Sequence, residues 1–225
     1  MAKRYRESFW GWYVVLGAFL VLCLSYGVRY SFGVFVYPMF KETGWPMSVI
    51  SLAASVNILT YSIVGIFCGR LADRIAPKWM MTTGSILTAV GFYVLIHAET
   101  PVGLYLSYGI LCGVGHACLG MVVCAAAIGK WFKRKRGVAL GLASMGIGVG
   151  TMIMGPAAGY IVSAYDWRTG FVVFGAVILA LGILISQVLM GKTTPEASGL
   201  LPDGEPAVRE GLSPDAVPEH RASAS

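Results

Sequence analysis

Six long apolar runs constrain this chain more than any other feature of its sequence. They lie at about 9–36, 47–68, 79–98, 102–129, 137–164 and 169–190. A hydrocarbon core about 30 Å thick is crossed by about 20 helical residues, so each run is long enough to span a membrane. The runs do not alternate polar with apolar residues, as the strands of a membrane barrel would. The sequence therefore predicts an all-α membrane protein with six transmembrane helices.

Charged residues are few and unevenly distributed. Hydrophobic residues make up 56% of the sequence and charged residues 12%, whereas soluble domains carry about 25% charged residues. This composition argues against a water-soluble enzyme and against disorder over most of the length. Residues 191–225 differ, because they are rich in proline, small and charged residues. We expect a cytoplasmic N-terminus at 1–8, a six-helix transmembrane domain at 9–190 and a disordered cytoplasmic tail at 191–225.

The Lys and Arg residues indicate which side of the membrane each connection faces. Fourteen of them lie in the N-terminal segment, the second–third connection, the fourth–fifth connection and the C-terminal segment: Lys3, Arg4, Arg6, Arg70, Arg74, Lys78, Lys130, Lys133, Arg134, Lys135, Arg136, Lys192, Arg209 and Arg221. The other connections hold two, Lys41 and Arg168. Positive charge concentrates in cytoplasmic loops. We therefore expect a multi-pass protein of the cell membrane with both termini cytoplasmic, and no nucleic-acid partner.

Arg29 is the one basic residue that falls inside a span. A charged side chain facing lipid is costly, so Arg29 either reaches out to the membrane surface or faces a cavity. On a helix it shares a stripe with Tyr26, Tyr30, Gly33 and Tyr37. A guanidinium binds a carboxylate through two parallel hydrogen bonds. Arg29, Tyr30 and Tyr26 are therefore candidates for binding an anion.

Two other spans carry polar residues near mid-depth. Asn57 and Tyr61 share one face of the second span, and His116 lies in the fourth. Asn57 is compatible with an interhelical hydrogen bond or with a cavity wall. His116 is compatible with a satisfied interior position, with a substrate contact or with a group that takes up a proton. We include all three among the candidate substrate-binding residues.

The fifth span is built for close helix contact. It holds three glycine pairs at a spacing of four residues: Gly137/Gly141, Gly146/Gly150 and Gly155/Gly159. Small residues at this spacing let two membrane helices approach closely. Gly155 and Pro156 lie in mid-span and should bend or locally open the helix. Both tight packing and a hinge for a moving helix are compatible with this pattern.

The sequence contains no motif typical of a hydrolytic enzyme or of a metal site. It has no HExxH and no GxSxG, and its three histidines are widely separated. The five cysteines lie in apolar runs without a CxxC pair, so they form no disulfide framework or zinc motif. Residues 146–150 resemble a dinucleotide loop only superficially, because they lie inside a span and follow no strand. We expect no enzyme activity, no metal and no cofactor.

Residues 69–78 carry a resemblance to a known family. They read Gly-Arg-Leu-Ala-Asp-Arg-Ile-Ala-Pro-Lys and resemble the cytoplasmic signature between helices two and three of the major facilitator superfamily. Gly69, Asp73 and Arg74 match the signature, and Ala76 stands where glycine is usual. In that family the aspartate and arginine latch the cytoplasmic ends of two six-helix halves. The resemblance implies the fold of the N-terminal half-bundle.

Further stretches resemble the monocarboxylate transporter and oxalate/formate branch. They are 9–16 (Phe-Trp-Gly-Trp-Tyr-Val-Val-Leu), 165–168 (Tyr-Asp-Trp-Arg) and 131–150, which begins Trp-Phe-Lys-Arg-Lys-Arg-Gly. From the last stretch we add Arg134 and Arg136 to the expected latch. In the alignment Tyr30 takes a position that is lysine in some members, and Arg29 is its neighbour. The Gly155-Pro156 stretch also resembles an antiporter signature, which keeps exchange as an option.

The resemblance implies a secondary active transporter of small monocarboxylate anions such as lactate, pyruvate, formate or oxalate. It implies proton coupling and alternating access between two halves that enclose the site. The sequence carries only the first half and lacks the family's binding arginine and coupling acidic residue of helix eight. We expect a second six-helix half or a homo-oligomer as partner. The alternative is a non-transporting membrane partner, or truncated remnant, that associates with another transporter half.

Overall fold

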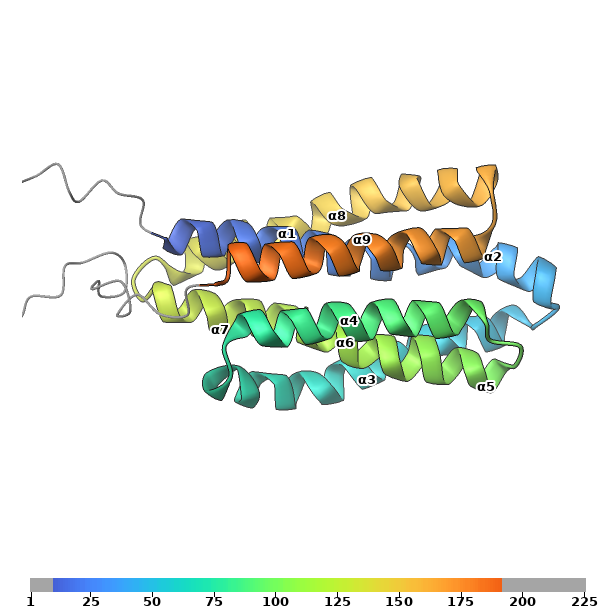
Figure 1. The fold of residues 1–225 in the computed structure, drawn as a ribbon, viewed down its shortest axis with the longest axis horizontal. Helices are drawn as coiled ribbons and strands as arrows, with labels where there is room; N and C mark the ends of the chain where they lie inside the picture. Colours follow the sequence, from blue (N-terminus) through green and yellow to red (C-terminus); the bar gives the residue numbers. More distant parts are fainter. Residues whose placement is uncertain (1–9, 192–225) are drawn as a thin grey trace, which may run out of the picture.

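The computed structural model describes residues 10–191, apart from the side chain of Asp73, and forms a bundle of helices (Figure 1). In this part of the chain six helical stretches are long and apolar enough to cross a membrane, which confirms the predicted number. The helices are α1 (Gly11–Tyr30), α2 (Phe32–Thr43), α3 (Met47–Arg74), α4 (Pro77–Ile96), α5 (Pro101–Leu104), the π-helix η2 (Tyr105–Leu111), α6 (Cys112–Cys118), α7 (Met121–Trp131), α8 (Arg136–Ala164) and α9 (Trp167–Val188).

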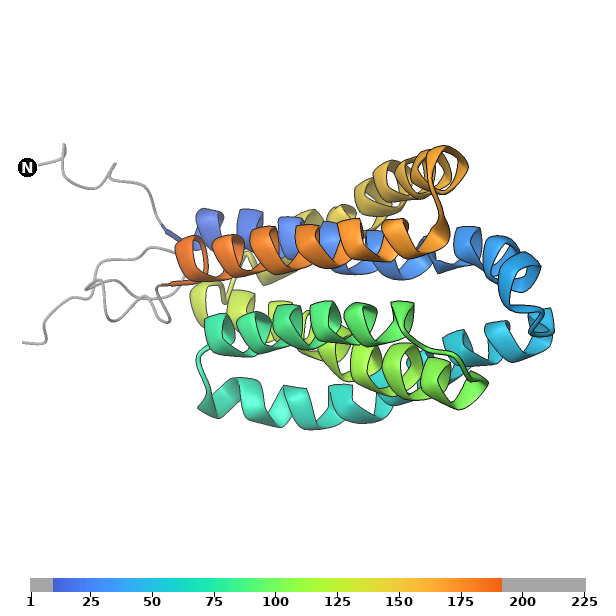
Figure 2. The same cartoon turned by 45° about the vertical axis from the view of Figure 1, so that its right-hand side comes forward.

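The helices lie side by side in two groups. Figures 1 and 2 show α1, α2, α8 and α9 in one group and α3 to α7 in the other. The most extensive contacts are between α1 and α8. Contacts between α4 and α9 link the two groups. The start of α1 and the end of α9 lie at the same end of the bundle (Figure 1), as an even number of crossings requires. The predicted cytoplasmic orientation of that end stays a prediction.

Glycines set the distance between α1 and α8. A Cβ at Gly146 would collide with the backbone oxygen of Phe19, and one at Gly150 would collide with that of Cys23. The middle glycine pair, Gly146 and Gly150, therefore lets the backbones of α1 and α8 come into contact, and this contact stabilises the helix pair through dispersion forces. The flanking pairs behave differently, because a Cβ at Gly137, Gly141, Gly155 or Gly159 would meet nothing within 4 Å.

The first span differs from its predicted extent of 9–36. α1 ends at Tyr30, the Ser31 hydroxyl donates to the backbone oxygen of Gly27 at 2.7 Å, and α2 then continues to Thr43. Gly44 ends α2 with a left-handed φ of 70°, a conformation that glycine adopts without steric cost. The apolar run marked only the apolar part of the span, whereas the helix extends through the charged Lys41 and Glu42.

In the fourth and fifth spans, the continuity of the helices differs from what the local sequence predicts. The predicted single helix at 102–129 contains the π-helix η2 and an interruption at Leu119 and Gly120 between α6 and α7. In contrast, α8 is continuous from Arg136 to Ala164, so Gly155 and Pro156 do not open it. The proline leaves the backbone carbonyl of Met152 without its helical donor, and Met152 lies on an exposed face.

A polar cluster joins three helices at the end of the bundle opposite the start of α1 (Figure 1). Glu42 at the end of α2 accepts a hydrogen bond from the Trp167 indole at 2.6 Å and forms an ion pair with Arg168. Arg168 also donates from Nε to the backbone oxygen of Ile96, at 3.1 Å. The ends of α2 and α4 are therefore tied to the start of α9, where Asp166 caps the helix by accepting from the Thr169 N–H at 2.5 Å.

Candidate functional site

Arg29 is a buried cation without an anionic partner in the described part of the chain. Only 9% of its surface is exposed. Its guanidinium carbon lies 4.2 Å from the centre of the Tyr61 ring, an arrangement that stabilises a cation through the electron-rich face of the ring. Among the described residues, the guanidinium of Arg29 makes no ion pair or hydrogen bond. Its hydrogen-bond donors therefore remain available to an anion.

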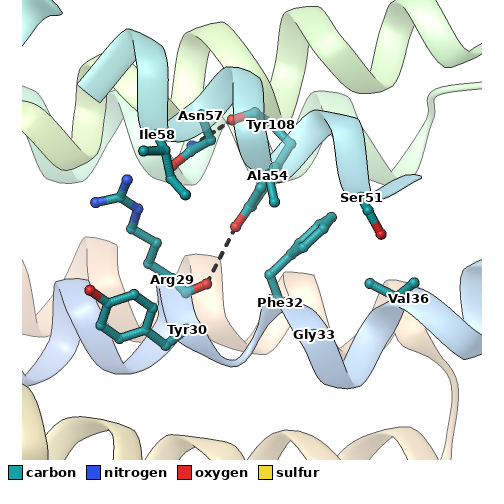
Figure 3. A pocket seen from close by; sticks show the side chains of 10 residues that line it. All are labelled: Arg29, Tyr30, Phe32, Gly33, Val36, Ser51, Ala54, Asn57, Ile58 and Tyr108. Atoms are coloured by element: carbon teal, nitrogen blue, oxygen red, sulfur yellow. Dashed lines mark hydrogen bonds between the residues drawn. The ribbon is translucent and has the colours of Figure 1, made fainter. Parts of the chain in front are cut away.

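A cavity of about 260 Å³ lies beside this guanidinium, between α1, α2, α3 and η2 (Figure 3). Apolar side chains make up most of its wall, with a few polar groups. The lining residues are Arg29, Tyr30, Phe32, Gly33, Val36, Ser51, Ala54, Asn57, Ile58 and Tyr108. Tyr30 and Ile58 are both more than half exposed, so the cavity opens at the surface of the bundle. A small, mostly apolar hollow with few polar groups is the usual form of a small-molecule site.

Tyr108 holds two sides of the cavity together. Its backbone oxygen accepts a hydrogen bond from Asn57 Nδ2 at 2.8 Å, and its hydroxyl donates to the backbone oxygen of Arg29 at 3.4 Å. Its ring stacks on Phe32 with 3.9 Å between ring centres. One residue of the π-helix therefore positions α1, the start of α2 and α3 around the same space.

Tyr26 and Tyr61 lie next to the cavity, outside its lining. Their hydroxyls are 2.7 Å apart and share a hydrogen bond. Tyr61 in turn carries the Arg29 guanidinium on its ring face. Tyr26 therefore supports the aromatic platform under Arg29, while Tyr30 and Gly33 of the predicted stripe reach the cavity itself. Tyr37, further along that stripe, is 62% exposed and lies outside the lining.

His116 lies apart from the cavity. It is 1% exposed, and its ring faces Phe92 of α4 at 6.5 Å between ring centres. Neither ring nitrogen has a hydrogen-bond partner within the described residues. The structure thus brings Arg29, Tyr30 and Asn57 together in the lining, adds Tyr26 and Tyr61 behind them, and leaves His116 in the bundle interior.

Sequence reasoning missed the apolar and aromatic lining, above all Tyr108. An aromatic residue inside an apolar run looks the same in the sequence whether it faces lipid, the core or a cavity. The available signal was its position on the fourth span, about two turns before His116, but a single helix does not reveal which neighbour each face meets.

The residues of the expected latch lie at the end of the bundle where α1 begins. Arg74 is exposed at the end of α3, Arg134 is exposed between α7 and α8, and Arg136 is exposed as the first residue of α8. Gly69 is close to α7, since a Cβ there would lie 3.2 Å from Val122. Lys130 Nζ donates to the backbone oxygen of Ala72 at 2.9 Å and ties α3 to α7. The side chain of Asp73 lies outside the described part of the chain.

These helices define a multi-pass helical membrane protein with a buried cation beside a small cavity. Comparison with known families agrees with that class, since the model of the Major Facilitator Superfamily matches residues 18–221. The chain belongs to the Major Facilitator Superfamily, and it is a multi-pass membrane protein with six apolar helices in its described part.

Individual relatives agree with this assignment. The chain is 34% identical over 186 residues to Monocarboxylate transporter 13 of Bos taurus, covering 81% of this chain and 43% of the relative. It is 32% identical over 190 residues to Riboflavin transporter RibJ of Trypanosoma cruzi, covering 83% and 40%. The crystal structure of peptide transporter POT in complex with sulfate matches the fold with a TM-score of 0.66 at 22% identity, covering 82% of this chain and 38% of that one. The chain therefore spans about two fifths of the length of these relatives.

Proposed function

We propose that this chain is the first six-helix half of a secondary active transporter that carries small monocarboxylate anions. The observation that carries the proposal is the unpaired, buried guanidinium of Arg29 at the wall of a small cavity. A cation held away from water in a membrane protein marks a substrate or ion pathway by default. The similarity to monocarboxylate transporters supports the choice of anion.

The cavity chemistry suits a small carboxylate. The guanidinium offers paired N–H donors that match the two oxygens of a carboxylate. The adjoining wall is apolar, with Phe32, Val36 and Ile58 in position to contact a short hydrocarbon chain. Tyr30 at the exposed rim adds a hydroxyl at the entrance. A space of about 260 Å³ favours a compact solute over a large one.

Transport requires a counterpart to this half. Alternating access moves two halves against each other around a central site, and the chain spans only 43% of its bovine relative. The outward glycines of α8 leave a helix face on which another helix could pack closely. A second six-helix half, or a second copy of the chain, would complete the cavity. The excess of Lys and Arg at the end where α1 starts supports a cytoplasmic position for both termini.

Proton coupling is the remaining part of the proposal. His116 is a titratable group enclosed in the bundle with no hydrogen-bond partner among the described residues. A histidine can take up and release a proton near neutral pH when its surroundings change. Opening of the bundle during the transport cycle would change those surroundings, and we assign His116 to that step.

A binding experiment on the chain in liposomes tests the anion site. Labelled propionate should bind saturably, and Arg29→Gln should weaken binding at least tenfold, because the carboxylate loses its cationic partner. Lys41→Gln removes a positive charge from the end of α2, outside the cavity, and should leave binding unchanged. Equal binding to the Arg29→Gln chain would contradict the proposed site.

An uptake experiment separates transport from binding. The liposomes would contain the chain alone, or the chain with the second half of the bovine relative, under an inward proton gradient. Uptake that needs both halves and collapses with the proton gradient supports the proposal. Arg29-dependent binding without uptake in either preparation would favour the alternative, a non-transporting partner of another transporter half.

A further inference from the structure

The amide of Asn57 presents an unused hydrogen-bond acceptor beside the cavity. The side chain is 1% exposed, and its Nδ2 donates to the backbone oxygen of Tyr108 at 2.8 Å. That bond fixes the orientation of the amide, because the reversed orientation would set two acceptor oxygens against each other. Oδ1 is then left without a hydrogen-bond partner within the described residues, and Figure 3 shows it on the side of the amide toward Arg29.

A buried acceptor without a donor is costly, so a ligand that supplies a donor gains affinity. Asn57 Oδ1 repels the oxygens of a carboxylate, which are acceptors as well. It therefore does not bind the same group as Arg29. It suits a second substituent of the ligand that carries an O–H or N–H.

The position of Asn57 relative to the cation limits where that substituent lies. Asn57 and Tyr61 are four residues apart on α3, about one helical turn or ~5.4 Å along the axis. The guanidinium rests on the Tyr61 ring. Arg29 and Asn57 line the same cavity of about 260 Å³, with Oδ1 on the side toward Arg29, so a donor that reaches Oδ1 lies close to the carboxylate, as a substituent on the adjacent carbon atom does. An ammonium in this position would be repelled by Arg29, whereas a hydroxyl is neutral.

We infer that Asn57 Oδ1 accepts a hydrogen bond from the hydroxyl of a 2-hydroxy carboxylate whose carboxylate is held by Arg29. The inference rests on the proposed function of this cavity and adds a specificity rule to it. Asn57 distinguishes a 2-hydroxy acid from the 2-oxo acid and from the unsubstituted acid of the same chain length. The apolar wall alone does not make this distinction, because the three acids have nearly the same shape.

A displacement series on the unaltered chain tests the rule without any mutation. The chain in liposomes is loaded with labelled propionate, and unlabelled lactate, pyruvate, alanine and propionate compete for the site. Lactate should displace the label at about a tenfold lower concentration than the other three, as expected for one added hydrogen bond to a buried acceptor. Equal displacement by lactate and pyruvate would overturn the inference.

Variants then assign the preference to Asn57. Asn57→Leu removes the acceptor at similar volume and should bring lactate to the level of propionate, while Arg29-dependent propionate binding persists and shows that the chain is folded. Ser62→Ala, which removes an exposed hydroxyl elsewhere on α3, should keep the preference for lactate. A preference that survives Asn57→Leu would overturn the inference alone. Absence of Arg29-dependent propionate binding in the unaltered chain would overturn the proposed function and the inference together.

Discussion

Single residues of this half-bundle combine several structural tasks. Tyr108 orients the Asn57 amide through its backbone oxygen and contacts the Arg29 backbone through its hydroxyl. Its ring also stacks on Phe32, so this one residue contacts three helices through its backbone and its side chain. The Tyr26 and Tyr61 pair plays the same part on the other side of Arg29. The polar chemistry of the cavity is therefore held in place by aromatic residues.

The sequence pointed to the candidate site chiefly through residues that are out of place, and Tyr30 followed from its position beside one of them on the same helix. Arg29 and Asn57 stand out because polar groups inside apolar spans are costly, and both line the cavity. Phe32, Ile58 and Tyr108 look like any other residues of an apolar span. His116 has the same polarity signal as Asn57 but packs toward Phe92. The face that each helix turns to its neighbours depends on tertiary packing, which spacing on one helix does not specify.

Asp166 gives a pH-dependent prediction at the start of α9. Hydrogen bonds from Thr169 lower the pKa of the Asp166 carboxyl below its usual value. The ionised form is therefore favoured by folding, and its contribution to stability is complete above the unfolded pKa of about 3.9 and is lost as the pH falls through the folded pKa. Asp166→Ala should cost about 1 kcal/mol of unfolding free energy at neutral pH.

Unfolding of the purified chain in detergent, followed by circular dichroism at several pH values, measures this effect. The difference between the Asp166→Ala variant and the unaltered chain should shrink below a pH of about 3.9. Asp166→Asn is the control, since asparagine caps a helix without titrating. A difference that stays constant down to pH 2 would contradict the assigned role of the carboxylate.

At the scale of elements, α8 is one continuous helix whose middle and outer parts have different surroundings. Its middle glycines, Gly146 and Gly150, press against the backbone of α1, whereas its outer glycines meet nothing inside the half. The sequence predicted the six spans well because length and apolarity decide which segments cross a bilayer. It did not predict the end of α1, the π-helix or the uninterrupted course of α8, because these depend on how neighbouring backbones supply or replace hydrogen bonds.

Matched glycine substitutions in α8 test this division. Gly150→Ala places a methyl group against the backbone of Cys23 and should destabilise the chain by about 1–3 kcal/mol. Gly148→Ala, two residues away, meets nothing within 4 Å and should be neutral or stabilise by up to about 1 kcal/mol through helix propensity. Thermal unfolding in detergent compares the two. Equal unfolding temperatures would mean that α1 and α8 do not approach as described.

At the scale of the whole described bundle, α8 lies at the periphery with one face uncovered. Met152 and Tyr160 of α8 are 80% and 73% exposed, next to outward glycines that leave room for a close neighbour. Lipid can cover such a surface, but a small-residue stripe is typical of helix association. The outer face of α8 is where we expect the completing half or a second copy to pack.

Two substitutions on this face should separate folding from assembly. A Cβ at Gly141 or Gly155 would meet nothing within 4 Å, so Gly141→Leu and Gly155→Leu should hardly change the unfolding temperature of the isolated chain. Association should weaken, as judged by co-purification with the tagged second half of the bovine relative or with a tagged copy of this chain. Undiminished co-purification with both would place the assembly surface elsewhere.

The solitary charge of Arg29 has an electrical consequence. Among the described residues it is the only buried Lys, Arg, Asp or Glu side chain. Moving one elementary charge across a membrane changes its electrical energy by about 2.3 kcal/mol per 100 mV. An empty cavity would carry that charge, whereas a cavity holding a monovalent anion would be neutral. With a proton also taken up on His116, as the proposed function requires, the loaded form would regain one positive charge, and the membrane voltage would act alike on the loaded and the vacant movements.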